Sequence, residues 1–171
     1  MGGILMHSPT DFGSAPSVDI IAFHLHEQEF CVKTTMVREI RGWAPCTPIP
    51  HAPENVLGVM NLRGTVFPII DLAGKLGMGS NRGNERCAIV VADVDSVIIG
   101  LVVDRVSDIL TIEEKRVQPV PPLAVGFDAR FTRGMIAQNT GMTCFLDLSA
   151  LFCGSDLSGD LENAAADDTR H

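Results

Sequence analysis

The chain carries a weak internal repeat, because several short motifs of its first half recur in the same order in its second half. The recurring motifs are a Val-led block (Val37 and Val106), a Pro-x-Pro triplet (Pro48 and Pro119), a glycine that opens a hairpin (Gly58 and Gly134) and an Asp-Leu pair (Asp71 and Asp147). The glycine and the aspartate are 13 positions apart in both halves. A module of about 65 to 75 residues buries too little surface to be comfortably stable alone. The repeat therefore predicts two related modules that pack together, with a groove at their junction.

Short apolar runs bounded by turn residues fill both halves, and such runs are the signal for β-strands joined in hairpins. The paired runs are residues 20–25 with 29–32, 56–62 with 66–70, 87–92 with 97–103, and 135–137 with 142–146. Helical stretches are few and short, at 71–76 and 147–152, and each begins with an aspartate that can cap free backbone N–H groups. We therefore expect a mainly all-β fold made of two related barrel-like modules.

Charge and composition divide the chain into three parts. We expect a leader over residues 1–17, a body over 18–153 with halves at 18–78 and 85–153, and a tail over 154–171. The tail holds five acidic residues and one basic residue, whereas the body is nearly balanced, with 15 acidic and 12 basic residues. A basic stripe for nucleic acid is missing from the sequence. No apolar run reaches the roughly 18 residues that would span a bilayer, so we expect no membrane insertion.

The sequence offers no set of residues that would catalyse a reaction. The five cysteines form no C-x-x-C pair and are interpreted as reduced thiols, which indicates the cytoplasm. His24 and His26 could share one face of a strand and hold a metal, but no third ligand is near them, and a solvent-facing position beside a turn is the simpler interpretation. Gly77 and Gly79 belong to a linker at 77–84 rather than to a dinucleotide fingerprint. We therefore expect no enzyme, no cofactor and no metal.

One region is far more specific than the rest. It contains VREIRG at 37–42, PIPHAP at 48–53 and GVMNLRGTVFPIIDL at 58–72, and the second half adds GLVVD at 100–104 and VSDIL at 106–110. These blocks closely resemble the signature of the CheW domain family, and the resemblance covers residues 18–153. The absence of Tyr and the FCV segment at 30–32 depart from the family pattern modestly.

The resemblance implies both a fold and a function. The family fold consists of two five-stranded, SH3-like β-barrel subdomains around a shared core. CheW-like proteins are non-enzymatic adaptors in the cytoplasm that couple methyl-accepting chemoreceptors to the CheA histidine kinase. The implied partners are the regulatory domain of CheA, the cytoplasmic tip of a chemoreceptor, and other CheW-like domains in the rings of the receptor array.

The resemblance also implies a set of partner-binding residues, which are Val37, Glu39, Gly58, Asn61, Arg63, Ala88, Gly100 and Ile109. Other roles stay open for several of them. Glu39 and Arg63 could form a surface salt bridge, the glycine at 58 could serve the geometry of a turn or bulge, and Val37 and Ile109 could be core residues. Arg63 is the strongest candidate, because an arginine in a tight Leu-Arg-Gly turn projects outward and can make forked hydrogen bonds.

Three other functions remain as alternatives. A CheW homologue could serve another pathway, such as surface sensing or twitching motility. A small β-barrel could bind a ligand or catalyse a reaction, which would need a concave site with convergent polar groups. A nucleic-acid-binding barrel is the third alternative, and the acidic charge disfavours it.

Overall fold

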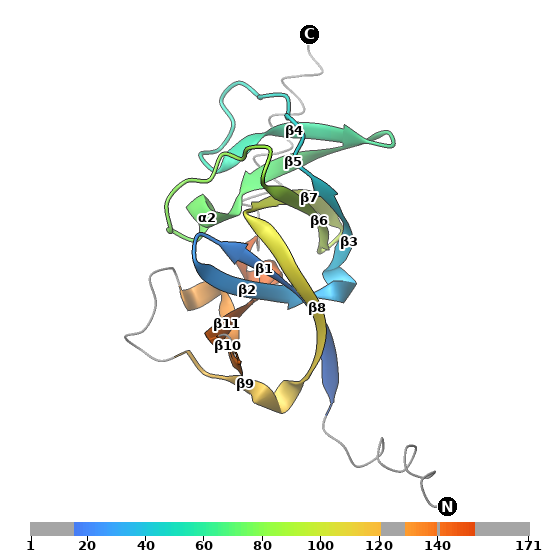
Figure 1. Cartoon of the computed structure of the whole chain (residues 1–171). Coiled ribbons are helices and arrows are strands. Elements are labelled where there is room, and N and C mark those ends of the chain that lie inside the picture. The colour runs from blue at the N-terminus through green and yellow to red at the C-terminus, as the bar shows by residue number, and fades with distance from the viewer. Residues whose placement is uncertain (1–15, 121–128, 140, 153–171) are drawn as a thin grey trace, which may run out of the picture.

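The computed structural model describes residues 16–120, 129–139 and 141–152, which form two curled β-sheets stacked end to end (Figure 1). The five-stranded sheet has the order β3 (Val37–Gly42), β6 (Ala88–Val94), β7 (Val97–Val103), β5 (Thr65–Asp71) and β4 (Val56–Leu62). The six-stranded sheet has the order β8 (Arg105–Glu113), β1 (Ser17–Leu25), β2 (Gln28–Lys33), β11 (Gly141–Leu146), β10 (Thr132–Gln138) and the short β9 (Val117–Gln118). The mainly-β fold that the sequence predicts is confirmed.

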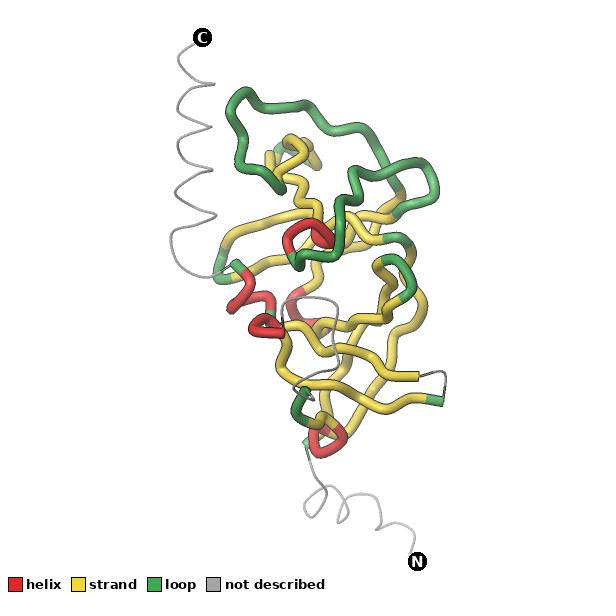
Figure 2. The backbone as a smooth tube through the Cα atoms, turned by 90° about the vertical axis from the view of Figure 1, so that its left-hand side faces the viewer, coloured by secondary structure: helices red, strands yellow, loops and turns green. Residues whose placement is uncertain are grey.

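The helices of the described segments are short and lie at the ends of strands (Figure 2). Two α-helices, α2 (Leu72–Lys75) and α3 (Leu148–Leu151), follow β5 and β11. Three 3-10 turns, η1 (Thr34–Met36), η2 (Glu114–Arg116) and η3 (Ala129–Phe131), connect strands. Within the described ranges, every helix is too short to cross a bilayer.

The two halves of the chain exchange their first hairpins. The β1–β2 hairpin of the first half lies in the six-stranded sheet, between β8 and β11 of the second half. The β6–β7 hairpin of the second half lies in the five-stranded sheet, between β3 and β5 of the first half. Each sheet is therefore completed by the other half of the sequence, and the internal repeat corresponds to this reciprocal arrangement.

In the described part of the chain, three apolar clusters make up the core. The largest contains residues of both sheets, among them Phe23, Phe30, Val90 and Leu101, and it joins the two sheets through α2 and α3. A second cluster fills the curl of the five-stranded sheet around Phe67, and a third fills the six-stranded sheet around Phe145. The shared cluster gives the protein one continuous interior, because the stabilisation from buried apolar area belongs to both sheets together.

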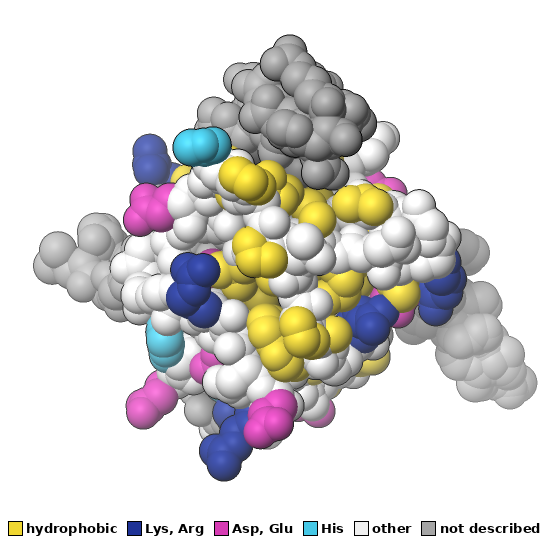
Figure 3. Space-filling model, turned by 90° about the horizontal axis from the view of Figure 1, so that it is seen from above, with side chains coloured by type: hydrophobic (Ala, Val, Ile, Leu, Met, Phe, Trp, Pro, Cys, Tyr) yellow, Lys and Arg dark blue, Asp and Glu magenta, His cyan; other side chains and the backbone are white. Residues whose placement is uncertain are grey.

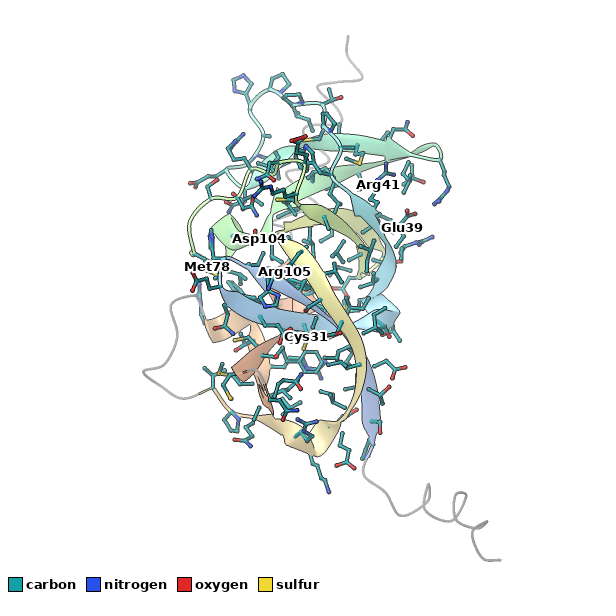
Figure 4. The ribbon with its side chains drawn as sticks, viewed as in Figure 1. Cys31, Glu39, Arg41, Met78, Asp104 and Arg105 are labelled. Atoms are coloured by element: carbon teal, nitrogen blue, oxygen red, sulfur yellow. The ribbon has the colours of Figure 1, made fainter. Side chains whose placement is uncertain are left out.

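The segment between the halves is tied to both sheets by hydrogen bonds. The buried carboxylate of Asp71, at the end of β5, accepts bonds from the Ser80 hydroxyl at 2.9 Å and from the Asn81 backbone N–H at 3.0 Å. The Asn81 amide donates to Asp104 at 2.5 Å, and Asp104 in turn accepts from the backbone N–H of His26 at 2.7 Å. Figure 4 shows Asp104 at the upper end of β8, on the same side of the molecule as the linker residue Met78. We call Asp71, Asn81, Asp104 and the β1–β2 turn the linker clasp.

Residues at equivalent positions of the two halves have the same structural roles. Gly58 and Gly134 each lie at a register shift in their hairpin, and a Cβ at either position would approach a backbone oxygen to 2.4 Å and 2.5 Å, respectively. Asp71 and Asp147 each cap a short helix by accepting a backbone hydrogen bond, from Gly74 at 2.9 Å and from Ala150 at 3.1 Å. The capping role that the sequence predicts for both aspartates is confirmed.

We predict that Gly58→Ala lowers the free energy of unfolding by about 2 kcal/mol. The new Cβ would lie 2.4 Å from the Thr47 carbonyl oxygen, so the 2.8 Å hydrogen bonds that pair Thr47 with Val59 would have to open. Chemical denaturation measures the change. Gly42→Ala is the control, because nothing lies within 4 Å of its Cβ position, and its effect should stay within about 0.5 kcal/mol. Equal effects at the two glycines would contradict the explanation.

Candidate functional site

The strand β3 lies at a free edge of the five-stranded sheet, and β8 lies at the equivalent edge of the six-stranded sheet. Each is paired on one side alone among the described strands, with β6 and with β1, respectively. Val37 on β3 and Val106 on β8 both pack against the shared core cluster. The two free edges therefore flank the junction of the two sheets, and their outer sides are open to contact by another protein.

The tight turn of the β4–β5 hairpin presents an arginine. Arg63 and Gly64 have φ angles of 54° and 85°, which is the backbone conformation that a two-residue hairpin turn requires. The side chain of Asn61 supports the turn by accepting a hydrogen bond from the Gly64 backbone N–H at 3.0 Å. The Arg63 side chain is 76% exposed. It therefore projects outward, as the sequence predicts.

Glu39 connects β3 to that turn. Its carboxylate accepts a charge-assisted hydrogen bond from the Arg63 guanidinium at 2.7 Å, while the Glu39 side chain is 27% exposed. The salt bridge that the sequence left open is thus present in the free protein. Because Arg63 is mostly in water, the pair contributes only about 0–1 kcal/mol to stability. Little free energy is therefore needed to break this ion pair when a partner competes for either residue.

A second arginine, Arg41, lies on the same side of β3 and has no partner among the described residues. Glu39 and Arg41 stand opposite Val91 and Ile89 of β6, so both side chains project toward the apolar cluster inside the five-stranded sheet. The Nε atom of Arg41 is buried and has no hydrogen-bond partner, and no ion pair joins Arg41 to a described residue. Figure 4 shows Glu39 and Arg41 along β3, on the side where the β4–β5 hairpin ends.

Replacing Arg41 with an apolar side chain is expected to stabilise the fold. A partly buried guanidinium without an acceptor loses hydration that no protein group replaces, whereas methionine of similar length does not. We predict that Arg41→Met raises the free energy of unfolding by about 1 kcal/mol, measured by urea denaturation. Arg38→Met is the control, because Arg38 is exposed and faces Asp93 at 3.4 Å. Destabilisation by Arg41→Met would show that the arginine has a stabilising partner.

Large apolar side chains are exposed on strands of both sheets. Ile109 on β8 is 67% exposed, Val66 on β5 is 60% exposed and Ile40 on β3 is 38% exposed. The interpretation of Ile109 as a core residue is therefore wrong, because its side chain lies on the solvent side of β8, whereas Ile112 of the same strand is buried. From above, apolar side chains gather in the middle of the face that carries the β4–β5 hairpin, with charged groups around them (Figure 3).

The other residues that the family resemblance suggested lie in different places. Ala88 begins β6 and is paired with Gly42 of β3, close to the free edge. Gly58 approaches the Thr47 backbone, which gives it the structural role that the sequence left open. Gly100 is buried in β7, where a Cβ would lie 2.7 Å from the side chain of Ile69. Gly100 thus shapes the interior and is not on the surface.

The histidines and cysteines of the described residues form no shared site. His24 is on β1, whereas His26 lies in the following turn with a φ of 56°, so the two do not share a strand face. Within the described parts of the chain, no three His, Cys, Asp or Glu side chains could hold a metal ion together. Burial raises the pKa of the Cys144 thiol to about 12, and burial, helped by the nearby Glu29 carboxylate, also raises the pKa of Cys31. Both thiols are therefore protonated and unreactive at neutral pH.

Three residues, Arg41, Ile40 and Val66, were not among the contact residues expected from the sequence. A signal for Arg41 existed, since it is two positions after Glu39 in a strand-like block and must share its side of the strand. No signal in the sequence indicated that Ile40 and Val66 are exposed, because an apolar residue in a strand is ordinarily expected on the buried side.

Comparison with known proteins identifies the family. The CheW-like domain model matches residues 19–154. The chain is 49% identical over 134 residues to chemotaxis protein CheW of Rhizobium meliloti, covering 78% of this chain and 86% of that protein. It is 30% identical over 146 residues to chemotaxis protein CheW of Klebsiella aerogenes, covering 85% and 88%, respectively.

A solved structure agrees with these sequence matches. The scaffolding protein TtCheW from Thermoanaerobacter tengcongensis superposes with a TM-score of 0.72 at 28% identity, covering 82% of this chain and 91% of that one. Its likeness extends across both curled sheets, since they make up most of the described chain. The chain therefore belongs to the CheW-like domain family.

Proposed function

We propose that this protein is a chemotaxis adaptor that couples methyl-accepting chemoreceptors to the CheA histidine kinase. The observation that carries the proposal is the family match over residues 19–154, together with relatives whose names are chemotaxis protein CheW. A scaffolding protein of known structure shares the fold. The function is one of binding rather than catalysis, and the protein is not an enzyme.

The exposed residues around the free strand edges provide the proposed contact surface. Ile109 offers apolar area, and Arg63 offers a guanidinium that can bind a carboxylate through two parallel hydrogen bonds. The proposed surface also includes Glu39 and Val37 on β3, Asn61 on β4 and Ala88 on β6. The proposed partners are the cytoplasmic tip of a chemoreceptor, the regulatory domain of CheA, and other CheW-like domains in the rings of an array.

Weak individual contacts suit an adaptor of this kind. Each interface of a small barrel is modest in area, but an array presents many partners at once. Linking several weak sites raises the overall avidity by about 10²–10⁴ without any new contact. The proposed location is the cytoplasm, at the membrane receptors to which the array is attached.

The proposal predicts that Arg63→Ala and Ile109→Ala weaken binding of the receptor tip by about tenfold each, because an exposed arginine and an apolar anchor are typical of interface hot spots. Isothermal titration against the receptor tip and against the CheA regulatory domain of the same organism measures both affinities. Arg38→Ala is the control, since that side chain is exposed and faces Asp93 at 3.4 Å. Failure of the folded wild-type protein to bind either partner would rule out the proposed function.

A further inference from the structure

The end of β3 carries one carboxylate and two arginines. Glu39 and Arg41 project to the same side of the strand, and Arg63 reaches Glu39 from the β4–β5 turn. The ion pair between Glu39 and Arg63, at 2.7 Å, leaves Arg41 without an ion pair to any described residue. Glu39, Arg41 and Arg63 together therefore carry two positive charges and one negative charge.

The unmatched arginine is within reach of the same carboxylate. Residues two apart on a strand have Cα atoms about 7 Å apart, and their side chains leave the strand in the same direction. A glutamate and an arginine at that spacing can meet by side-chain rotation alone. Glu39 can therefore pair with either arginine, and in the free protein its Oε2 accepts from Arg63.

We propose that Glu39 exchanges between the two arginines when a partner protein binds. An acidic side chain on the contact surface of that partner takes the exposed guanidinium of Arg63, and Glu39 then turns to pair with Arg41. The proposal deepens the adaptor function and rests on it for the existence of the partner. The two arginines have one carboxylate between them, so the partner must supply a second carboxylate.

The exchange is favourable for two reasons. The pair that breaks is the more exposed one, because Arg63 is 76% exposed, so water compensates for much of its loss. The pair that forms engages Arg41, whose Nε is buried, in surroundings where charges interact more strongly than in water. In the bound state both arginines have an acceptor, whereas the free state leaves one without.

A test on the isolated full chain needs no partner. In ¹H–¹⁵N spectra, the Nε–H resonance of Arg41 reports whether that group has an acceptor. Arg63→Gln frees Glu39, so the Arg41 resonance should shift and its hydrogen exchange should slow by about tenfold. Glu39→Gln combined with Arg63→Gln should abolish both changes. An unchanged resonance in Arg63→Gln, or the same change in the double variant, would overturn the exchange.

A second measurement links the exchange to binding. Titration of the receptor tip into Arg41→Gln should show an affinity lower by about fivefold to tenfold, because the bound state loses the new ion pair. Arg38→Gln is the matched control on the same strand and should change the affinity by less than twofold. Equal affinities of wild type and Arg41→Gln would also overturn the proposal. Because the spectra are recorded without any partner, failure of the exchange is distinguishable from failure of the adaptor function.

Discussion

Fragments comprising residues 1–83 and 84–171 are each expected to be unfolded alone and to assemble into the native fold when mixed. The reason is the reciprocal exchange of hairpins. Without the second fragment, the five-stranded sheet lacks its two central strands, β6 and β7, and the β1–β2 hairpin lacks both of its neighbours. The shared apolar cluster also draws residues from both fragments, so neither fragment can bury it alone.

The measurement is a ¹H–¹⁵N spectrum of each labelled fragment before and after addition of the unlabelled one. Each fragment alone should give narrow dispersion, and the equimolar mixture should reproduce the spectrum of the intact chain. The cut lies beyond Asn81, so the hydrogen bonds from Asn81 to Asp71 and Asp104 can still form. A dispersed spectrum from either fragment alone would contradict the mutual dependence of the halves.

Asp71→Ala is expected to lower the free energy of unfolding by about 3–4 kcal/mol, a large part of the stability of an ordinary domain. Asp71 is 3% exposed, and its carboxylate accepts hydrogen bonds from Gly74, Ser80 and Asn81. Its removal leaves these donors without an acceptor and opens the linker clasp. The loss is therefore larger than that of a single cap.

The internal repeat provides a matched control for this experiment. Asp147 occupies the equivalent position, caps α3 through the Ala150 backbone N–H, and has no linker to hold. Asp147→Ala should cost only about 1 kcal/mol, the usual value of a helix cap. Urea denaturation of both variants gives the difference between them. Similar losses at the two positions would mean that the clasp contributes nothing beyond capping.

Local features of the fold were predictable from the sequence, because they depend on neighbouring residues. The apolar run at 56–62 coincides with β4, and the Arg63-Gly64 turn follows it. The helix caps at Asp71 and Asp147 were also predictable, since capping requires one side chain and the next few N–H groups. The exchange of hairpins was not predictable in this way. An alternating pattern identifies a strand and its buried side, but it does not select the strand with which it pairs.

The candidate contact surface was predictable to a similar extent. The exposure of Arg63 follows from its place in a tight turn, and its pairing with Glu39 was one of two roles that the residue types allowed. The exposure of Ile109 depends on β8 being an outer strand, which is a property of the whole sheet. The lack of a partner for Arg41 likewise depends on what surrounds it in space, which its position in the sequence does not reveal.

The pairing of β2 with β11 bears on how the chain folds while it is being made. Glu29 pairs with Thr143, 114 residues later, so at a synthesis rate of about 5–20 residues per second the first hairpin waits about 6–23 s for that neighbour. Until β8 is made, Phe23, Phe30 and the other apolar residues of β1 and β2 have no further strand of the sheet to pair with, and β2 then still waits for β11. The earliest part of the nascent chain is thus the last to be completed, and its yield in cells is expected to depend on chaperones that shield this hairpin.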